Sequence, residues 1–348
     1  MDSATQEINI LKEKLQQFSL PNKLQEKLTV RLGQLSKLTN SPVFLPEFDR
    51  ISKYIDWVTA LPWEKRTEDK LSLESTERVL NKNHHGLDEI KERVLEYVSV
   101  MKLKEERGET RDIYRAPILC FVGLVGTGKT TIASSIAESL GRKFARIPFG
   151  GMGSPLDLRG QSRMHAEAEP GKIVKALVSV KTKNPVILLD EIDRVTDAGR
   201  SSIMGVLVEL LDPEQNNTYI DHYIDYPIDL SEVLFIATAN NTTSISTAVL
   251  DRIEPLSMPS YTDQEKIVIG KDYMLPQILK EAGVDPEVIT IEDDAWAKVV
   301  RPLGFDAGIR TLERTIKGIV RKISKLIVEN KGQNFVINSE NVGKYLPR

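Results

Sequence analysis

The sequence has a single cysteine, Cys120, among 348 residues, and aromatic residues make up only 6% of the chain. One cysteine cannot form an internal disulfide, which argues against a disulfide-stabilised secreted fold and favours a reducing compartment. No apolar run approaches the ~20 residues that a bilayer-spanning helix needs, and the N-terminus has no secretory apolar core. The chain is long enough for two or three globular units, each with its own core.

The chain also lacks a strong excess of charge of either sign. Its 47 Lys and Arg residues face 50 Asp and Glu residues, for a net charge of −3. Such a balance does not favour nucleic acid or an anionic membrane as the main partner. The basic cluster at Lys317, Arg321, Lys322 and Lys325 fits a solvated helix face better than a nucleic-acid surface.

Residues 123–130 read Gly-Leu-Val-Gly-Thr-Gly-Lys-Thr. They follow an apolar run at 118–122 and precede residues 131–140, in which apolar side chains recur at helical spacing. A strand, a glycine-rich turn and a helix in this order are the phosphate-loop pattern. The glycines let backbone N–H groups surround a phosphate chain, and the helix N-terminus adds its dipole. We expect Lys129 at the β- and γ-phosphates of ATP or ADP, and the Thr130 hydroxyl on Mg²⁺. The expected nucleotide-binding residues are Gly123, Gly126, Thr127, Gly128, Lys129, Thr130, Thr131 and Asp190.

Further along the chain, residues 185–191 form an apolar run that ends in Asp190-Glu191. A buried strand that ends in two acids suits a phosphate-loop protein: Asp190 would hold the Mg²⁺ shell and Glu191 would polarise the attacking water. Asn240 ends another apolar run, 233–240, and can contact the γ-phosphate or water, although a turn-initiating Asn fits equally well. Arg252 can reach a neighbouring subunit's γ-phosphate, as arginine fingers do.

The remaining pattern predicts an α/β domain between two helical parts. We place the boundaries at 1–66 for a helical bundle with helices near 8–18, 24–35 and 48–57, at 67–258 for the α/β domain, and at 259–348 for an all-α lid. Helices are also expected at 73–81, 87–104 and 203–211. In the lid we expect helices at 262–274, 276–281, 293–300 and 308–331, and a short β piece at 336–337. The His84-His85-Gly86 segment has no third ligand at metal-site spacing, so a plain polar loop near the nucleotide is expected.

These residues together resemble Lon, the ATP-dependent serine protease family of the AAA+ superfamily. The resemblance covers nearly the full chain from Tyr54 onward and includes the phosphate loop and 184–191. Its more specific stretches are Leu61-Pro62-Trp63, Asp212-Pro213-Glu214-Gln215-Asn216 and 307–314. It implies an AAA+ phosphate-loop NTPase with a parallel sheet flanked by helices. A short helical bundle, similar to the end of Lon's N-terminal region, would precede it and a small α-helical lid would follow.

The resemblance also implies roles for single residues and for the assembly. Asn240 corresponds to sensor 1, Arg252 to the arginine finger and Arg310 to sensor 2, beside the water-activating Glu191. The implied assembly is a homohexameric ring. It would hydrolyse ATP with Mg²⁺ and pull unfolded or damaged proteins through its channel.

Three positions depart from the Lon pattern. Leu124-Val125 replaces two prolines of the phosphate loop, but the essential Gly, Lys and Thr remain, so we expect nucleotide binding to persist. The pore loop normally carries an aromatic, an aliphatic and a glycine; the matching residues here are His165, Ala166 and Glu167. These offer less apolar contact to a substrate, so we expect a weaker or altered grip. Ser201-Ser202-Ile203 replaces a Gly-Asp-Pro.

The chain stops at Arg348, just after the lid, and nothing in it resembles the family's Ser–Lys proteolytic domain. We therefore expect a fragment of a longer protein that cuts no peptide bond by itself. The residues at 118–121 and 235–241 resemble those of eukaryotes and suggest an organellar Lon, peroxisomal in preference to mitochondrial. A cytoplasmic location is the alternative.

Two other functions compete with the Lon-type motor. One is a nucleotide-dependent scaffold or chaperone-like ring with little translocation, motivated by the altered pore loop; ATP turnover that is indifferent to unfolded protein would favour it. The other is an AAA+ machine acting on nucleic acid, supported only by the basic cluster near Arg321; salt-sensitive DNA binding would favour it.

Overall fold

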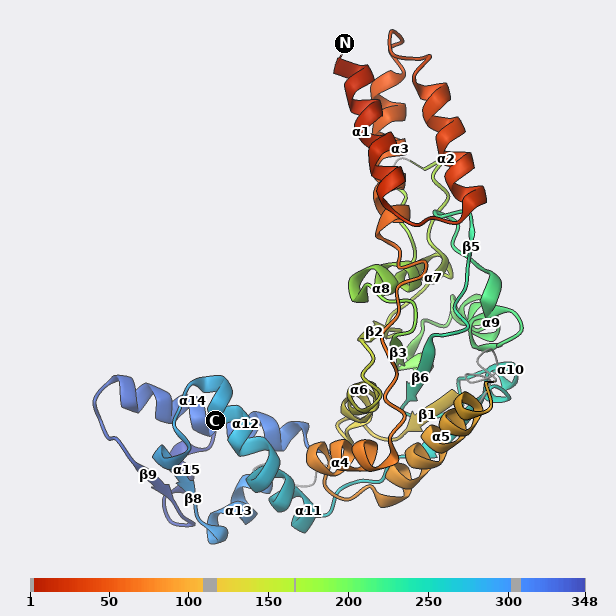
Figure 1. Cartoon of the computed structure of the whole chain (residues 1–348). Helices are drawn as coiled ribbons and strands as arrows, with labels where there is room; N and C mark the ends of the chain where they lie inside the picture. Colours follow the sequence, from red (N-terminus) through yellow and green to blue (C-terminus); the bar gives the residue numbers. More distant parts are fainter. Residues whose placement is uncertain (1–2, 109–117, 166, 302–307, 348) are drawn as a thin grey trace. The chain divides into compact units, whose positions relative to one another are not determined.

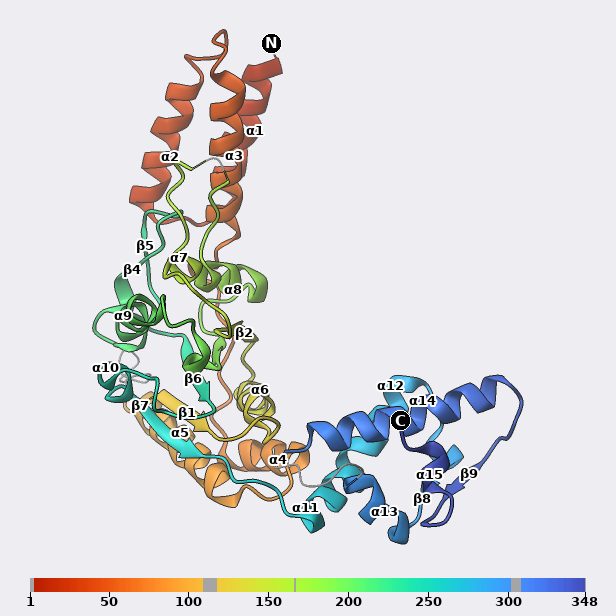
Figure 2. The same cartoon turned by 180° about the vertical axis from the view of Figure 1, so that it is seen from behind.

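The computed structural model describes residues 3–108, 118–165, 167–301 and 308–347. Tertiary contacts divide the chain into two compact units, each built from three separate segments. The first unit comprises 1–72, 98–120 and 137–255, and the second comprises 73–97, 121–136 and 256–348. Figures 1 and 2 show the elements from two opposite sides.

The N-terminal helices α1 (Ser3–Gln17), α2 (Asn22–Leu35) and α3 (Phe44–Ala60) pack side by side in the first unit (Figures 1 and 2). The seam of α2 consists of Leu24, Leu28, Leu32 and Leu35, all at most 2% exposed. Leucines three or four residues apart fall on one helix face and bury together. The expected helical bundle is confirmed, but α3 is longer than predicted because Phe44 adds a buried anchor to its first turn.

The central sheet has five strands in the order β2-β3-β6-β1-β7. These are β1 (Ile118–Val122), β2 (Phe144–Pro148), β3 (Val186–Asp190), β6 (Leu234–Ala239) and β7 (Ile253–Ser257). The pairs β2–β3 and β3–β6 are parallel, and both faces of β3 and β6 are buried. A fully buried parallel strand reads as a continuous apolar run, which is why the sequence revealed these strands. Strand β7 escaped prediction because it contains a proline and half-exposed positions, as an edge strand does.

The first unit also contains elements that the sequence analysis did not predict. Helix α8 (Lys172–Val180) packs against β2, and β4 (Tyr219–Ile220) pairs antiparallel with β5 (Pro227–Ile228). This unit also contains the short helices α7 (Leu156–Arg159) and α10 (Thr247–Leu250), and helix α9 (Arg200–Leu211), which was expected at 203–211. Helix α6 (Lys129–Ser139) follows β1 along the chain.

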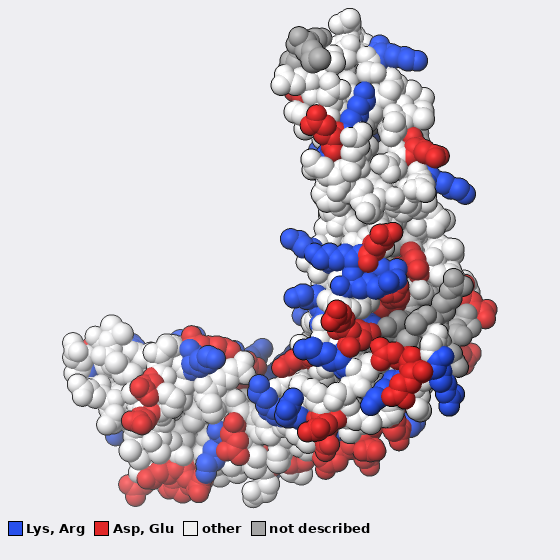
Figure 3. Space-filling view, in the orientation of Figure 1, with Lys and Arg blue, Asp and Glu red and all other residues white. Residues whose placement is uncertain are grey.

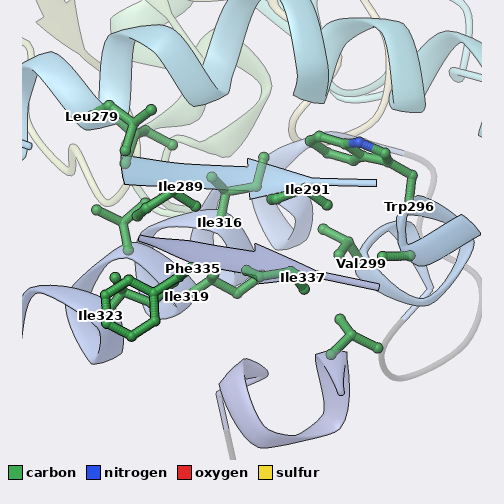
Figure 4. Close-up of a cluster of buried hydrophobic side chains, with 14 of the residues drawn as sticks. Leu279, Ile289, Ile291, Trp296, Val299, Ile316, Ile319, Ile323, Phe335 and Ile337 are labelled. Carbon is green, nitrogen blue, oxygen red and sulfur yellow. The ribbon is translucent and has the colours of Figure 1, made fainter. Parts of the chain in front are cut away.

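The second unit contains α4 (Leu73–Asn83), the first part of α5 (Asp88–Glu106) and the C-terminal helices. These are α11 (Asp263–Val268), α12 (Leu275–Ala282), α13 (Asp293–Val300), α14 (Arg310–Val328) and α15 (Val342–Tyr345), with a π-helix at Ile269–Met274. Thr262 and Glu265 form a capping box that starts α11. Trp296 of α13 and the apolar face of α14 share one core (Figure 4).

The prediction of an all-α lid is wrong in one respect. Strand β8 (Ile289–Ile291) pairs in parallel with β9 (Phe335–Ile337), where only a short β piece near 336–337 was expected. Alternate residues of both strands enter the core that Figure 4 shows, whereas Thr290 and Val336 face solvent. Three residues carry too little pattern for a confident assignment, and the pairing depends on contacts between segments far apart in the sequence. Within the described parts of the chain, no helix combines the length and apolarity needed to cross a bilayer.

Candidate functional site

The phosphate loop has the backbone geometry that its glycines permit. Gly126 has φ 86° and Gly128 has φ 92°, a left-handed region that costs glycine little. Lys129 opens α6, and its Nζ donates to the carbonyl oxygens of Gly123 at 2.5 Å and Leu124 at 2.9 Å. The predicted order of strand, glycine-rich turn and helix is therefore confirmed.

The start of α14 lies against this loop within the second unit. The Ile309 N–H donates to the Gly126 carbonyl at 3.0 Å. A Cβ placed on Gly126 would lie 3.2 Å from Cγ of Arg310, and one on Gly308 would lie 2.5 Å from the Val125 carbonyl oxygen. The approach to the Val125 carbonyl leaves room for glycine alone at position 308, and these contacts bring Arg310, which the sequence singled out, beside the phosphate loop.

A buried tyrosine supports the loop from the same unit. The Tyr261 hydroxyl donates to the Thr127 carbonyl at 3.1 Å, and the Tyr261 side chain is 7% exposed. Burial, with the nearby Glu265 carboxylate, raises the pKa of Tyr261 to about 12. The phenol therefore stays protonated and keeps donating to the loop across the physiological pH range.

The segment with two histidines differs from the plain polar loop that was expected. His84 is 7% exposed, and its Nε2 lies 2.9 Å from the Ser135 hydroxyl of α6. Lys91 donates to the His84 carbonyl at 2.8 Å. Burial, followed by the positive charge of Lys91, lowers the pKa of His84 to about 4. His84 thus acts as a neutral buried contact between α4 and α6. Nowhere in the described ranges do three or more His, Cys, Asp or Glu side chains gather as a metal site.

The acidic end of β3 lies in the first unit. Asp190 is 4% exposed, and both of its carboxylate oxygens accept hydrogen bonds. Arg146 donates to Oδ2 from Nε at 2.7 Å, and the Thr238 hydroxyl donates to Oδ1 at 2.5 Å. The same Thr238 oxygen accepts the Glu191 N–H at 2.8 Å. Sequence reasoning missed both partners, although Thr238, a polar residue inside an apolar run two positions before Asn240, offered a signal.

Glu191 has an unusual backbone. Its φ of 57° and ψ of 50° lie in the left-handed region, which non-glycine residues seldom adopt. The Arg194 guanidinium lies 3.8 Å from its carboxylate, and a Cβ on Gly150 would lie 3.4 Å from Oε2. Such conformations cost on the order of 1–3 kcal/mol and cluster at functional sites. Glu191, one of five described non-glycine residues with a positive φ, is thus also the residue that the sequence assigned to water activation.

Asn240 and Arg252 are both held by carboxylates of the first unit. The Asn240 amide donates to Asp193 at 3.3 Å, and Arg252 donates to Asp212 at 3.0 Å and to the Ala248 carbonyl at 2.8 Å. Burial alone would raise the pKa of Asp212, but hydrogen bonds from the Glu214 N–H and from Arg252 outweigh it and lower that pKa. The first residue of the Asp-Pro-Glu-Gln-Asn stretch therefore orients Arg252.

The segment at 160–171 contains the predicted pore loop, and its base is tightly fixed. A Cβ on Gly171 would lie 1.9 Å from the Leu158 carbonyl oxygen, so only glycine fits there. The Gly171 N–H donates to the fully buried Asp221 carboxylate at 2.7 Å. Burial raises the pKa of Asp221, although three backbone N–H groups oppose the shift.

The tip of this segment is exposed but tethered. The Arg163 guanidinium lies over the Tyr54 ring of α3, 3.8 Å from its centroid. His165 and Glu167 are exposed, and Met164, which the sequence analysis overlooked, is 88% exposed. The predicted Ala166 lies outside the described residues.

Comparison with known protein families gives two matches on this chain. Residues 119–258 match the model of the AAA family, the ATPase family associated with various cellular activities. Residues 280–336 match the model of the Lon protease AAA+ ATPase lid domain. The first match contains the phosphate loop, Asp190-Glu191, Asn240 and Arg252, and the second contains Arg310.

Curated relatives match over almost the whole chain. The Lon protease of Dictyoglomus thermophilum is 41% identical over 347 residues, which are 99% of this chain and 43% of that protein. Lon protease 2 of Thermus thermophilus is 40% identical over 350 residues, again 99% and 43%. Lon protease 1 of Bacillus subtilis is 39% identical over 345 residues, with the same shares. The chain thus spans about two fifths of the length of these relatives, and over that span it is similar to the AAA+ ATPase module and the lid domain of Lon proteases.

Proposed function

We propose that this chain is the ATP-hydrolysing motor of a Lon-type ATP-dependent protease. It unfolds and translocates protein substrates toward a serine–lysine protease domain that these residues do not include. The observation that carries the proposal is that one chain, which matches Lon relatives throughout, contains a glycine-built phosphate loop, a buried Asp190 and a Glu191 in the left-handed backbone region.

The phosphate-loop side supplies binding. The backbone of the loop surrounds the phosphates of ATP or ADP, and the Lys129 ammonium neutralises charge on the β- and γ-phosphates. Arg310 adds a second positive group from the start of α14. The residues that hold the nucleotide are Gly123, Gly126, Thr127, Gly128, Lys129, Thr130 and Thr131.

The acidic side supplies the chemistry. Glu191 orients and polarises the attacking water, and Asn240 positions the water or the γ-phosphate. The Thr130 hydroxyl and the Asp190 carboxylate are the hard oxygen donors that Mg²⁺ prefers, so the donor set fits this ion. When bound, Mg²⁺ would neutralise charge that develops on the phosphates.

Arg252 completes the site of a neighbouring subunit, so hydrolysis requires assembly. We propose a homohexameric ring that acts on unfolded or damaged proteins. Domain boundaries at 66/67 and 258/259 stay a prediction. An organellar location, peroxisomal or mitochondrial, also stays a prediction. The relatives named above are bacterial.

The test is ATP turnover as a function of protein concentration, for the chain and for Glu191→Gln. Turnover of the unaltered chain should rise faster than linearly with concentration, because Arg252 serves a neighbour. Glu191→Gln should keep nucleotide binding and lose about 10²- to 10⁴-fold in turnover, the usual contribution of a general base. Glu7→Gln, at an exposed position of α1, is the matched control and should change neither nucleotide binding nor turnover.

Strict proportionality between turnover and concentration would contradict the shared site. The comparisons lend no support to the scaffold without translocation. The scaffold would be favoured over the motor by two results together. An unfolded protein would leave ATP turnover unchanged, and the chain would unfold no folded protein in an unfolding assay.

A further inference from the structure

A groove in the first unit lies where α1–α3 meet the α/β part of that unit. Its volume is about 890 Å³, and its walls are the turn between α1 and α2, the Leu61-Pro62-Trp63 turn and β5. A second hollow of about 570 Å³ shares the Leu61-Pro62-Trp63 wall and extends along the end of α8. We call the two together the Trp63 groove. None of the proposed nucleotide residues lines it.

The wall of the Trp63 groove is aromatic and rigid. The rings of Trp63 and Tyr226 meet edge to face with centroids 5.9 Å apart, and both side chains are only half-buried. The indole N–H of Trp63 donates to the Val58 carbonyl at 2.8 Å, which fixes the ring. Pro62 and Pro227 flank the rings and have no N–H to offer. Preorganised aromatic rings beside prolines offer a bulky apolar side chain contact at little entropic cost.

The rim of the Trp63 groove carries unpaired positive charge. Lys23, Lys65 and Lys181 are exposed and line the groove or the adjoining hollow. Their ammonium groups form no ion pair with any residue in the described ranges. Figure 3 shows Lys and Arg side chains gathered at the level of α8, beside the paler surface of the N-terminal helices.

The other cations of the rim are already neutralised. Arg66 and Lys183 both pair with Glu232, at 2.7 Å and 2.8 Å, and Lys183 also lies 3.9 Å from Asp229. Acidic and basic groups therefore alternate around part of the wall. The exposed Glu64 carboxylate also lines both hollows beside Trp63, so a continuous phosphate backbone would meet negative charge between the lysines. Separate carboxylates placed opposite the three unpaired lysines fit better.

We propose that the Trp63 groove binds an acidic, extended segment of another polypeptide. One large apolar side chain of that segment packs on Trp63 and Tyr226, and its carboxylates face Lys23, Lys65 and Lys181. Apolar burial supplies most of the affinity, and the lysines select the charge and the register. The proposal goes beyond the ATPase function and does not depend on hydrolysis.

The probe is a fluorescein-labelled peptide of sequence Glu-Asp-Leu-Phe-Asp-Glu, titrated with the whole chain without nucleotide and followed by fluorescence anisotropy. Two control peptides are titrated in the same way: a neutral peptide with Gln and Asn in place of the acids, and an acidic peptide with Ser in place of Leu and Phe. Lys23→Glu combined with Lys65→Glu tests the rim, and Tyr226→Ser tests the wall. Lys37→Glu, an exposed lysine of the turn between α2 and α3 outside the groove, is the matched charge control.

Only the acidic apolar peptide should bind well, and high salt should weaken its binding because exposed charges are screened. The double lysine variant should weaken it about tenfold, since each exposed ion pair contributes ~0.2–1 kcal/mol and reversal adds repulsion. Tyr226→Ser should weaken it as well, whereas Lys37→Glu should stay within about twofold. Unchanged circular dichroism and melting temperature would show that the variants fold.

Equal binding of the neutral peptide, or unchanged binding by the double variant, would overturn the proposal. Preferential binding of labelled single-stranded DNA would overturn it in favour of nucleic acid. Sedimentation showing self-association that the double variant abolishes, without peptide binding, would assign the groove to a second copy of the chain. ATP turnover should be unchanged in all groove variants, so failure here and failure of the proposed ATPase function are distinguishable.

Discussion

The phosphate loop and the acidic end of β3 are built in opposite ways. The loop at 123–130 is contiguous, and backbone groups and glycine conformations give it its shape. The acidic end joins Arg146, Asp190 and Thr238 from three different strands through side-chain hydrogen bonds. A loop whose shape depends on its own backbone should be sensitive to substitution of its glycines and less sensitive to substitution of the side chains around it. An assembly of the second kind can fail through a single missing hydroxyl.

The largest effect should come from removing the one essential side chain of the loop. Lys129→Ala deletes the charge that faces the phosphates, so nucleotide binding and turnover should both fall, turnover by about 10³-fold or more. Equilibrium binding of a fluorescent ATP analogue separates this variant from Glu191→Gln, which should keep binding. If Lys129→Ala bound nucleotide normally, the assignment of the loop would be wrong.

Thr238→Val tests the acidic side with a substitution of nearly the same shape. It leaves Asp190 Oδ1 without its donor and the Glu191 N–H without its acceptor, in a buried place. We expect the free energy of unfolding to fall by about 1–3 kcal/mol, the cost of unsatisfied buried groups, and turnover to fall by about tenfold to a hundredfold.

Thr59→Val is the matched control for Thr238→Val. Thr59 is also buried, but its hydroxyl donates to carbonyls of its own helix, those of Ile55 at 2.8 Å and Asp56 at 3.2 Å. Its replacement should change neither turnover nor nucleotide binding. Equal losses of turnover in both variants would point to general loosening of the first unit instead of a specific role for Thr238.

His84 extends the comparison to pH, because it supports the helix that follows the loop. The unfolded chain protonates His84 below its ordinary pKa of 6.5, whereas the folded chain keeps it neutral down to about 4. Stability from this group is therefore complete above pH 6.5 and declines as the pH falls toward 4. Between pH 7 and pH 5 the loss should be about 2 kcal/mol.

Calorimetric melting temperatures at several pH values would measure this loss. His84→Gln should flatten part of the decline toward acid pH, while His222→Gln, on an exposed side chain, should follow the unaltered chain. A His84→Gln profile parallel to that of the unaltered chain would show that another group causes the acid sensitivity.

The smallest effect should come from Arg146→Gln. Arg146 and Mg²⁺ are both cations that seek the Asp190 carboxylate, so the variant should need a few-fold less Mg²⁺ for half-maximal nucleotide binding. Arg194→Gln, which touches Glu191 instead, should leave the Mg²⁺ requirement unchanged. A higher Mg²⁺ requirement in Arg146→Gln would mean that the arginine orients Asp190 more than it competes with the ion.

The two sides of the comparison also differ in how far they could be predicted. The loop, α6 and strands β1, β3 and β6 followed from apolar runs and glycine spacing, because those signals are local. Edge strand β7, strand β8 and the pairing of β8 with the expected β piece at 336–337 did not, because three to five residues with a proline or an exposed position carry too weak a pattern. His84 was expected in a plain polar loop, since burial of a histidine depends on what packs over it.

The sequence by itself determined the phosphate-loop pattern, the acids at the end of β3, the leucine seams of the N-terminal helices and the likeness to Lon. Each of these is written in neighbouring residues or in a fixed helical or strand period. Only the tertiary structure revealed that Arg146 and Thr238 hold Asp190, that Asp212 holds Arg252, and that three unpaired lysines surround Trp63. Apart from Lys65, which follows Trp63 closely in the sequence, these partners lie tens of residues apart, and packing and hydrogen bonding in the folded chain bring them together.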